Sequence, residues 1–271
     1  MKSVGSIIQK VLMVPPTHFC VEYSINPWMG GIVDKNKAME QWNNLKNLIE
    51  IEGVKVLTLE QVEGLPDMVF SCNFGLVYKN KVFISKFRHS QRKGEEKYFK
   101  KWFMDNNYEI IGDSSDDTFE GGGDAFFSDY QTLWGGYGER TDENVYNNIS
   151  QLGINEFEII KCQLVHPLYY HMDTCMSPYS ETACLWYPPA FSIESQEKIK
   201  KKLPDSIEVD DEEAKKFICN SICIRNTIIS PIGMKQLTKN KLMKQGYNVK
   251  EIDMSEFMKS GGACQCLVLK L

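Results

Sequence analysis

The amino-acid sequence predicts an α/β fold built from five repeated strand–strand–helix–strand units. Segments with a helical spacing of apolar residues begin near residues 36, 91, 142, 192 and 235. A regular period of roughly 50 residues indicates repeated structural units, even where the repeats have lost their sequence similarity. Strand-like runs also open and close the chain, so the last strand is able to pair with the first. Five units joined in this way would form a closed ring around a central channel, with no exposed sheet edge.

The individual elements follow from apolar periodicity and from turn residues. In the first predicted helix, residues 36–50, Met39, Trp42 and Leu45 recur at helical spacing, with Asn36 as the N-cap and Gly53 after the end. The other predicted helices are residues 90–104, 142–152, 192–202 and 235–245. The predicted strands are residues 10–14, 54–59, 69–78, 81–85, 108–111, 119–127, 131–134, 157–162, 164–171, 182–187, 207–209, 218–220, 222–229, 248–252 and 264–271. A doubly wound sheet fits less well, because paired strands recur between helices where that fold expects one.

The composition is that of a globular protein with a large core. The chain has 271 residues, of which 42% are hydrophobic and 25% charged. The net charge of −5 argues against sequence-independent binding to nucleic acid, which needs clustered Lys and Arg. No run of about 18 apolar residues occurs, which predicts no membrane span. Residues 1–9 lack the apolar region of a secretory signal, which indicates a cytoplasmic protein.

The nine cysteines are expected to be reduced thiols, because disulfides are uncommon in the cytosol. No CxxC spacing is present, and Cys219 and Cys223 lie in an apolar run, so no metal site is predicted. Most of these thiols are expected to be buried as small hydrophobic groups.

The sequence FEGGGD at residues 119–124 holds two acids close together around three glycines. Two neighbouring carboxylates suit a cationic ligand, and a planar guanidinium donates bidentate hydrogen bonds to a carboxylate. A phosphate loop is excluded, because no lysine follows and the acids would repel phosphate. Metal binding by Glu120 and Asp124, or a solvated acidic turn, are the remaining alternatives.

A histidine and two cysteines complete the candidate residues. His171 closes the predicted strand 164–171, and Asp173 is placed to orient it and make it more basic. Taken by itself, this pattern also fits a hydrogen-bonded histidine of the core. Cys264 and Cys266 follow the flexible segment SGGA at residues 260–263, and they lie on one face of an extended strand. Either thiol qualifies as a nucleophile; Cys266 is preferred because it opens the apolar run.

Together these motifs resemble the guanidino-group-modifying enzymes of the pentein superfamily: arginine deiminases, dimethylarginine dimethylaminohydrolases, amidinotransferases and arginine dihydrolases. That superfamily has a five-bladed α/β propeller of ββαβ units, the pentein fold. The likeness is strongest to the catalytic domain of bacterial arginine dihydrolases. It rests on MVPP (13–16), YSINPWM (23–29), the Asn73 segment, FEGGGD (119–124), LWGGYG (133–138) and HMDTC (171–175). The likeness covers the whole chain and implies one catalytic domain over residues 1–271.

The resemblance implies a role for each matching position. Cys266 would be the nucleophile, and His171 the general acid and base. Glu120 and Asp124 would lie along the guanidinium site, with Asp124 in direct contact. Asp173 would orient His171 or hold the distal nitrogens of the substrate. Nearby carboxylates would raise the pKa of the thiol, so the cationic substrate would help to form the thiolate.

Four further positions match residues that bind substrate in the dihydrolases, with the two arginines at the α-carboxylate: Asn26, Asn73, Arg92 and Arg140. The dihydrolases carry Asn at the position of Asn73, where many deiminases carry an acid. Cys72 and Phe74 flank Asn73, where the dihydrolases more usually have small residues.

The activity implied is cysteine-dependent hydrolysis of guanidino C–N bonds through a covalent amidino-Cys intermediate, without a metal or organic cofactor. The leading expectation is an arginine dihydrolase that converts L-arginine to L-ornithine, ammonia and carbon dioxide. The alternative is an arginine deiminase or a dimethylarginine dimethylaminohydrolase giving citrulline. An amidinotransferase, which needs an acceptor amine, is less favoured.

The expected partner is a small guanidino compound, arginine or a derivative of it, and not a nucleic acid or a membrane. Ribosome anti-association factors share this fold, but the acidic net charge and the retained Cys, His and acids argue against such a binding role. A homo-oligomer is compatible with the sequence.

Overall fold

The computed structural model describes residues 8–271, which form five three-stranded sheets. In each sheet the middle strand runs antiparallel to one neighbour and parallel to the other. The predicted set of five ββαβ units, arranged as an α/β propeller, is therefore confirmed.

The strands, given sheet by sheet, are β15 (Leu269–Lys270), β1 (Lys10–Met13) and β2 (Lys55–Thr58); β3 (Gly75–Tyr78), β4 (Lys81–Ile84) and β5 (Glu109–Ile111); β6 (Ala125–Asp129), β7 (Thr132–Tyr137) and β8 (Glu158–Gln163); β9 (Met176–Ser180), β10 (Ala183–Trp186) and β11 (Ile207–Glu208); β12 (Ile222–Ile224), β13 (Thr227–Pro231) and β14 (Asn248–Ile252).

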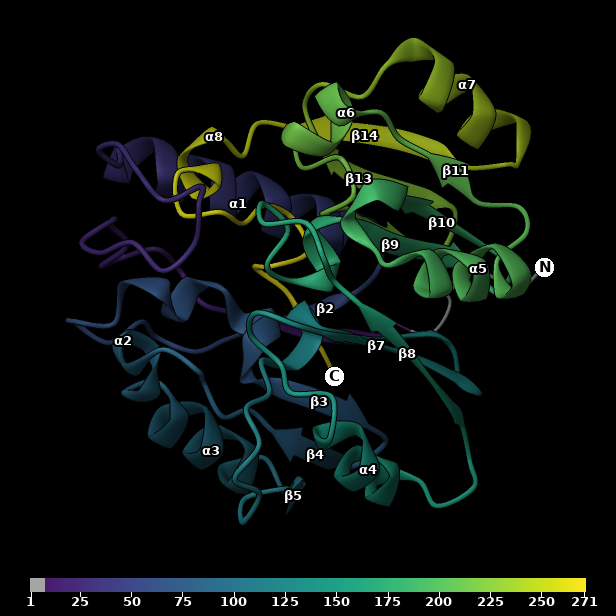
Figure 1. The fold of residues 1–271 in the computed structure, drawn as a ribbon. Coiled ribbons are helices and arrows are strands. Elements are labelled where there is room, and N and C mark those ends of the chain that lie inside the picture. Colours follow the sequence, from purple (N-terminus) through teal and green to yellow (C-terminus); the bar gives the residue numbers. More distant parts are fainter. Residues whose placement is uncertain (1–7) are drawn as a thin grey trace.

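The helices that join the parallel strands are α1 (Lys35–Ile51), α2 (Ser90–Lys93), α3 (Glu96–Asp105), α4 (Val145–Ile149), α5 (Ile193–Lys202) and α7 (Gln236–Lys244). The short helices α6 (Asp211–Lys215) and α8 (Ser255–Met258) lead from one sheet to the next. Figure 1 shows α1, α3, α4, α5 and α7 on the outside of the molecule, with the sheets inside them.

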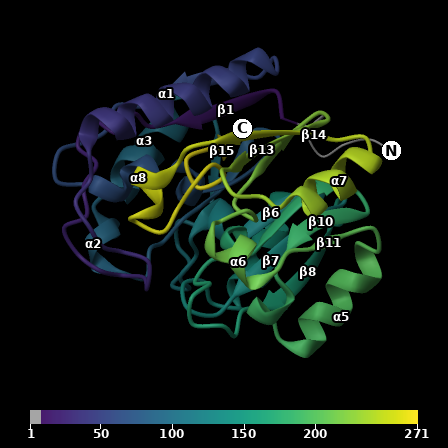
Figure 2. The same ribbon diagram turned by 90° about the horizontal axis from the view of Figure 1, so that it is seen from above.

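The strand β15 closes the ring, as the sequence predicts. It pairs antiparallel with β1, with Val11 opposite Lys270 and Leu12 opposite Leu269. Figure 2 shows this last strand beside β1, beneath helix α1. The nucleophile candidate Cys266 is therefore fixed near the middle of the molecule by the pairing that closes the propeller.

Buried apolar side chains fill the spaces between neighbouring sheets. One cluster joins Leu12 and Leu269 of the first sheet to Val82 and Ile84 of the second. Three similar clusters lie at the other junctions around the ring. Burial at these junctions stabilises each sheet against its neighbours by roughly 25 cal/mol per Å² of apolar surface.

Two predicted helices differ in detail. The N-cap of α1 is Asp34 and not Asn36, because the Asp34 carboxylate accepts hydrogen bonds from the backbone N–H groups of Asn36 and Lys37. Both residue types are good caps, so propensity alone did not decide between them. The predicted helix 90–104 is divided into α2 and α3 at Gly94 and Glu95.

Several predicted strands begin as 3₁₀ turns. Turns at Ser71–Phe74 and Gly121–Gly123 occupy the starts of the predicted strands 69–78 and 119–127. Residues 164–171 form no strand, so the placement of His171 at a strand end is wrong: it precedes the turn Met172–Thr174, which leads into β9. Cys264 and Cys266 also lie in turns and not on an extended strand. The turn at Ser71–Phe74 and the turn around Cys266 are buried, so their apolar pattern does not distinguish a strand from a turn. Residues 164–168, in contrast, are partly or fully exposed, and Pro167 interrupts the run.

The expectation of no secretory signal concerns a segment whose residues 1–7 lie outside the described part of the chain. Within residues 8–271, no helix has the length and apolar character needed to cross a membrane.

Candidate active site

The turn that carries Cys266 is held by one buried amide, Asn220. Its Oδ1 accepts hydrogen bonds from three backbone N–H groups, those of Ala263, Gln265 and Cys266, at 3.0, 3.1 and 3.3 Å. Its Nδ2 donates to the carbonyl of Asp173 at 3.0 Å and to the sulfur of Cys266 at 3.1 Å. Asn220 therefore fixes the backbone around the thiol and also contacts the thiol itself.

Two further groups contact this sulfur region. The Sγ of Cys266 makes a hydrogen bond with Asp173 Oδ2 at 3.1 Å, and the thiol of Cys72 donates to the same oxygen at 3.7 Å. The two sulfur atoms and a carboxylate oxygen of Asp173 lie within 4.8 Å of one another, and all three residues are buried. The other oxygen of Asp173, Oδ1, is buried without a hydrogen-bond partner in the described part of the chain.

The pKa values in this cluster are strongly shifted. Burial raises the pKa of Asp173 well above its usual range, and the neighbouring Cys266 adds to the rise. Burial also raises the pKa of Cys72 well above its usual range. Burial opposes ionisation of Cys266 too, but hydrogen bonds from Cys72 and Asp173 outweigh it and lower the pKa to about 7. The expectation that nearby carboxylates raise the pKa of this thiol is therefore wrong, because the hydrogen bond with Asp173 lowers the pKa of Cys266.

The three glycines of the FEGGGD turn are required by close packing. A Cβ at Gly121, whose φ is 56°, would lie 2.8 Å from the carbonyl oxygen of Cys72. A Cβ at Gly123 would lie 2.5 Å from Asn73 Nδ2 and 3.0 Å from a ring nitrogen of His171. The turn therefore packs its bare backbone against the segments that carry the other candidate residues.

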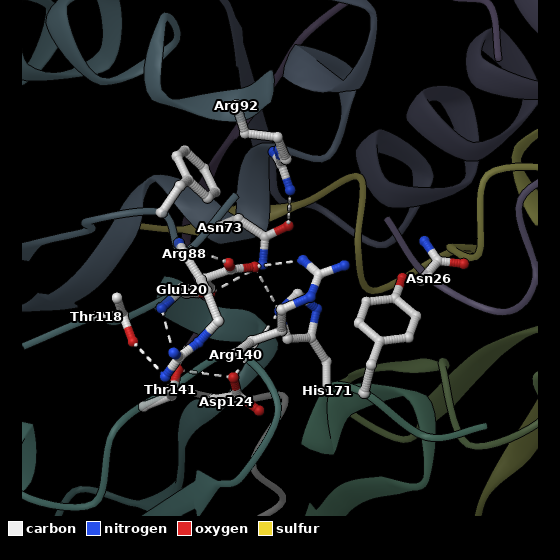
Figure 3. A network of polar contacts seen from close by, with 12 residues as sticks. Asn26, Asn73, Arg88, Arg92, Thr118, Glu120, Asp124, Arg140, Thr141 and His171 are labelled. Carbon is white, nitrogen blue, oxygen red and sulfur yellow. Dashed lines mark hydrogen bonds and ion pairs between the residues drawn. The ribbon is translucent and has the colours of Figure 1, made fainter. Parts of the chain in front are cut away.

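Glu120 is the acid partner of His171. Its Oε2 lies 2.8 Å from His171 Nε2 and 2.9 Å from Arg140 Nη1 (Figure 3). Burial raises the pKa of Glu120, but the guanidinium of Arg140 and the hydrogen bond with His171 reverse the effect and hold the pKa well below its usual range. An ionised Glu120 accepts the Nε2 proton of His171 and thereby orients the ring.

Asp124 lies at the other end of the turn and is held by a different set of donors. Its two oxygens accept hydrogen bonds from the Thr141 hydroxyl at 2.7 Å and from the Met172 backbone N–H at 3.0 Å. Its Oδ2 is 3.8 Å from His171 Nε2. Burial raises the pKa of Asp124 to about 6. Both acids of the motif, Glu120 and Asp124, thus lie beside the His171 ring and are held by hydrogen bonds to neighbouring residues.

Asn73 and Arg92 form one hydrogen-bonded unit. Arg92 Nη1 donates to Asn73 Oδ1 at 2.8 Å, and Asn73 Nδ2 donates to the backbone carbonyl of Glu120 at 2.8 Å. Arg92 also makes a bidentate pair with Glu95, at 2.9 and 2.8 Å. Burial raises the pKa of Glu95 to about 7 despite this pair. Arg92 therefore fixes the orientation of the Asn73 amide.

Arg140 and Asn26 lie on another side of the site. Arg140 Nη2 donates to the carbonyl of Ile25 at 2.6 Å, and its guanidinium lies 4.7 Å from the centre of the Tyr170 ring. Its Nε is buried without a partner among the described residues. Asn26 Nδ2 donates to the carbonyl of Ser260 at 3.0 Å. Figure 3 shows Asn26 apart from the Glu120–His171 contacts.

The structure brings the sequence-predicted residues into one region at the start of the inner strands. Cys266 lies with Asp173, and His171 lies with Glu120 and Asp124, while Asn73 and Arg92 bridge toward Glu120. Phe74, in contrast, is buried in the core, where it stacks on Phe99 with ring centres 4.7 Å apart.

Sequence analysis missed four buried polar residues: Asp67, Glu95, Thr141 and Asn220. Only one of them carried a usable signal, since Asn220 interrupts an apolar run. A polar residue at such a place needs a hydrogen-bonding partner when buried.

The comparison with protein families matches residues 31–271 to the family described as N,N dimethylarginine dimethylhydrolase, eukaryotic. The chain is 57% identical to an uncharacterized protein of Caenorhabditis elegans over 270 residues, covering 100% of this chain and 96% of the relative. It is 31% identical to the N(G),N(G)-dimethylarginine dimethylaminohydrolase of Mycobacterium tuberculosis, covering 97% of this chain and 86% of that enzyme.

A cyanobacterial protein is also similar. The bifunctional arginine dihydrolase/ornithine cyclodeaminase ArgZ of Synechocystis is 38% identical over 97% of this chain, but the chain spans only 37% of the length of that relative. The structure of the N-terminal domain of ArgZ bound to product superposes with a TM-score of 0.92, at 38% identity over 96% of both chains. A dimethylarginine dimethylaminohydrolase adduct with S-methyl-L-thiocitrulline has a TM-score of 0.81 at 21% identity and supports the fold alone.

Proposed function

Because the chain belongs to the guanidino-group-modifying hydrolases of the pentein superfamily, we propose that it is an arginine dihydrolase that acts as a single catalytic domain. The overall reaction takes L-arginine and two waters to L-ornithine, carbon dioxide and two molecules of ammonia. One observation carries the substrate class. The sulfur of Cys266 lies 3.1 Å from Asp173, whose buried Oδ1 has no partner in the described part of the chain. A guanidinium N–H is a fitting donor for that oxygen, because a buried carboxyl oxygen is costly to leave unpaired.

The first half of the reaction forms the covalent intermediate. The Cys266 thiolate attacks the guanidinium carbon and makes an S–C bond, and His171 gives a proton to the departing nitrogen as the C–N bond breaks. Ammonia leaves, and an amidino group remains on Cys266. With its pKa lowered to about 7, Cys266 has a substantial thiolate fraction at neutral pH.

The second half releases the product. His171, now neutral, takes a proton from a water molecule, and the resulting hydroxide attacks the amidino carbon. The S–C bond breaks as the new hydroxyl group loses its proton to the solvent, and citrulline and the thiolate are formed. A second cycle on citrulline transfers the ureido carbon to Cys266, again with loss of ammonia. Hydrolysis of that adduct gives a carbamate, which breaks down to ornithine and carbon dioxide.

The remaining residues are assigned either to substrate binding or to holding His171 in place. Arg140, with its unpaired Nε, supplies positive charge for the α-carboxylate. Arg92, which is already paired with Glu95, holds the Asn73 amide, and Asn26 donates a hydrogen bond to the carbonyl of Ser260. Glu120 keeps His171 oriented, and Asp124 supports the same ring from 3.8 Å. Asp173 faces the guanidinium.

Asn73 is the residue that favours a second cycle. A neutral amide at this position accommodates the uncharged ureido group of citrulline, whereas a carboxylate favours the guanidinium cation. Its orientation is fixed from both sides, by Arg92 at 2.8 Å and by the Glu120 carbonyl at 2.8 Å. The similarity to ArgZ, 38% identical, supports the same interpretation.

Product analysis tests the proposal. Purified protein is incubated with arginine, and citrulline, ornithine and ammonia are followed by chromatography over time. We expect ornithine with two ammonia per ornithine, and no turnover by Cys266→Ala. Citrulline as the final product would remove the dihydrolase assignment and leave a deiminase.

The second candidate is dimethylarginine hydrolysis, which the family match over residues 31–271 favours. Dimethylarginine is therefore assayed in parallel, with dimethylamine as the diagnostic product. A kcat/KM for dimethylarginine above that for arginine would reverse the order of the two candidates.

A further inference from the structure

A second thiol lies beside the proposed nucleophile, where its hydrogen bond helps to lower the pKa of Cys266, but it forms no bond in the proposed reaction. Cys72 is buried and donates a hydrogen bond to Asp173 Oδ2 at 3.7 Å, and its sulfur lies within 4.8 Å of that of Cys266. The other buried cysteine of this turn, Cys264, is not part of this cluster.

The backbones that carry the two thiols are tied together. The backbone N–H of Cys72 donates to the carbonyl of Cys266 at 3.2 Å. At the adjacent positions, the Ser71 hydroxyl donates to the carbonyl of Leu267 at 2.9 Å. With the two segments fixed side by side, side-chain rotation is the movement needed to bring the sulfurs to a bonding distance of about 2.05 Å.

We propose that Cys72 is a resolving cysteine, which forms a disulfide with Cys266 after a peroxide has oxidised Cys266. The disulfide occupies the nucleophile, so it would stop catalysis until a thiol reductant restores it. The effect on activity rests on the proposed function, whereas formation of the disulfide does not.

The chemistry balances with hydrogen peroxide as the oxidant. The Cys266 thiolate attacks one peroxide oxygen, the O–O bond breaks, and the sulfenic acid forms with loss of hydroxide. The Cys72 sulfur then attacks the Cys266 sulfur, the S–S bond forms, and the S–O bond breaks. The thiol proton of Cys72 passes through Asp173 to the leaving hydroxide, which departs as water. The sum is two thiols and one peroxide giving one disulfide and two waters.

The order of the two thiols follows from their surroundings. Hydrogen bonds lower the pKa of Cys266 to about 7, so it supplies the thiolate that reacts with peroxide. Burial raises the pKa of Cys72 well above its usual range, so it remains a thiol until Asp173 accepts its proton. A cavity lined in part by Cys72, Gly122 and Gln265 gives a molecule as small as hydrogen peroxide a route to this cluster.

The test compares wild type with Cys72→Ser and, as a matched buried control, Cys264→Ala. Each protein is exposed to hydrogen peroxide with a chelator present, because Cys72, Asp173 and Cys266 are also potential metal ligands. Half of each sample then receives dithiothreitol. Arginine turnover is measured relative to each untreated protein, and nonreducing peptide mass spectrometry locates the bonds.

We expect wild type and Cys264→Ala to lose activity, to show a peptide linked through Cys72 and Cys266, and to recover nearly all of their activity with dithiothreitol. Cys72→Ser should proceed to the sulfinic acid at Cys266 and recover less than about a tenth. A Cys264–Cys266 linkage, or equal recovery by Cys72→Ser, would overturn the proposal. If the protein turned over no guanidine, the linked peptide would still decide this inference, and the proposed function alone would fall.

Discussion

Cys264 and Cys266 are two residues apart in one turn, and both are buried, yet their surroundings are opposite in kind. Burial raises the pKa of Cys264 well above its usual range, and the neighbouring Cys266 adds to the rise. Cys266 is also buried, at 3% exposed against 0% for Cys264, but the groups around its sulfur make hydrogen bonds with it, and its pKa falls to about 7. The reactivity of a buried thiol is therefore decided by the donors around it and not by its exposure.

The largest effect on kcat is expected from substitution of one of the two cysteines and not of the other. Cys266→Ser should lower kcat for arginine by about 10⁴-fold or more, because it removes the nucleophile. Cys264→Ala should leave kcat within about threefold and cost about 1 kcal/mol of the free energy of unfolding through lost packing. Ammonia release and urea denaturation measure the two quantities. The reverse pattern of activities would transfer the nucleophile role to Cys264.

A smaller effect is expected at the amide that makes the two environments different. Asn220→Ala should lower kcat by about 10- to 100-fold, with less change in KM, because the turn and the thiolate lose their donors. The alkylation pKa of Cys266 should rise in the same variant. Asn240→Ala, at an exposed position of α7, is the matched control. A loss of kcat with no change in the thiol pKa would show that Asn220 acts on the backbone alone.

The smallest expected effect is the pH dependence of Cys266 alkylation. The thiolate is the reactive form, so alkylation of Cys266 by iodoacetamide should slow as the pH falls below about 7 and level off above it. Rates are read from the Cys266 peptide in the Cys264→Ala background. A midpoint near the ordinary thiol value of 9.0 would mean that Asp173 faces the sulfur as an ionised carboxylate.

The periodicity of the sequence predicted the repeat and the closure of the ring by β15, and the motifs singled out His171, Cys266 and the two acids as candidate site residues. These features depend on local patterns, such as helical spacing or a glycine-rich turn between acids. The predicted strand at residues 164–171 failed, because Pro167 interrupts the run and has no backbone N–H to donate to a neighbouring strand.

Contacts between segments that are distant in the sequence could not be predicted from it. Nothing near Asn220 in the sequence indicates that its amide contacts Cys266, and nothing near Asn73 indicates that its amide contacts Arg92. The lowered pKa of Cys266 depends on hydrogen bonds with Cys72, Asp173 and Asn220, which only the three-dimensional arrangement brings to its sulfur.

Each sheet contributes to the site through the segment that directly precedes its inner strand. Asn73 stands before β3, Asp124 before β6, Asp173 before β9, Asn220 before β12 and Cys266 before β15. A fragment with fewer than five blades would therefore lack at least one of these site residues. Most of these contacts join residues far apart in sequence, an arrangement that is slow to form and cooperative once formed. The site therefore depends on all five sheets being in place, and separation of any two neighbouring sheets would abolish activity.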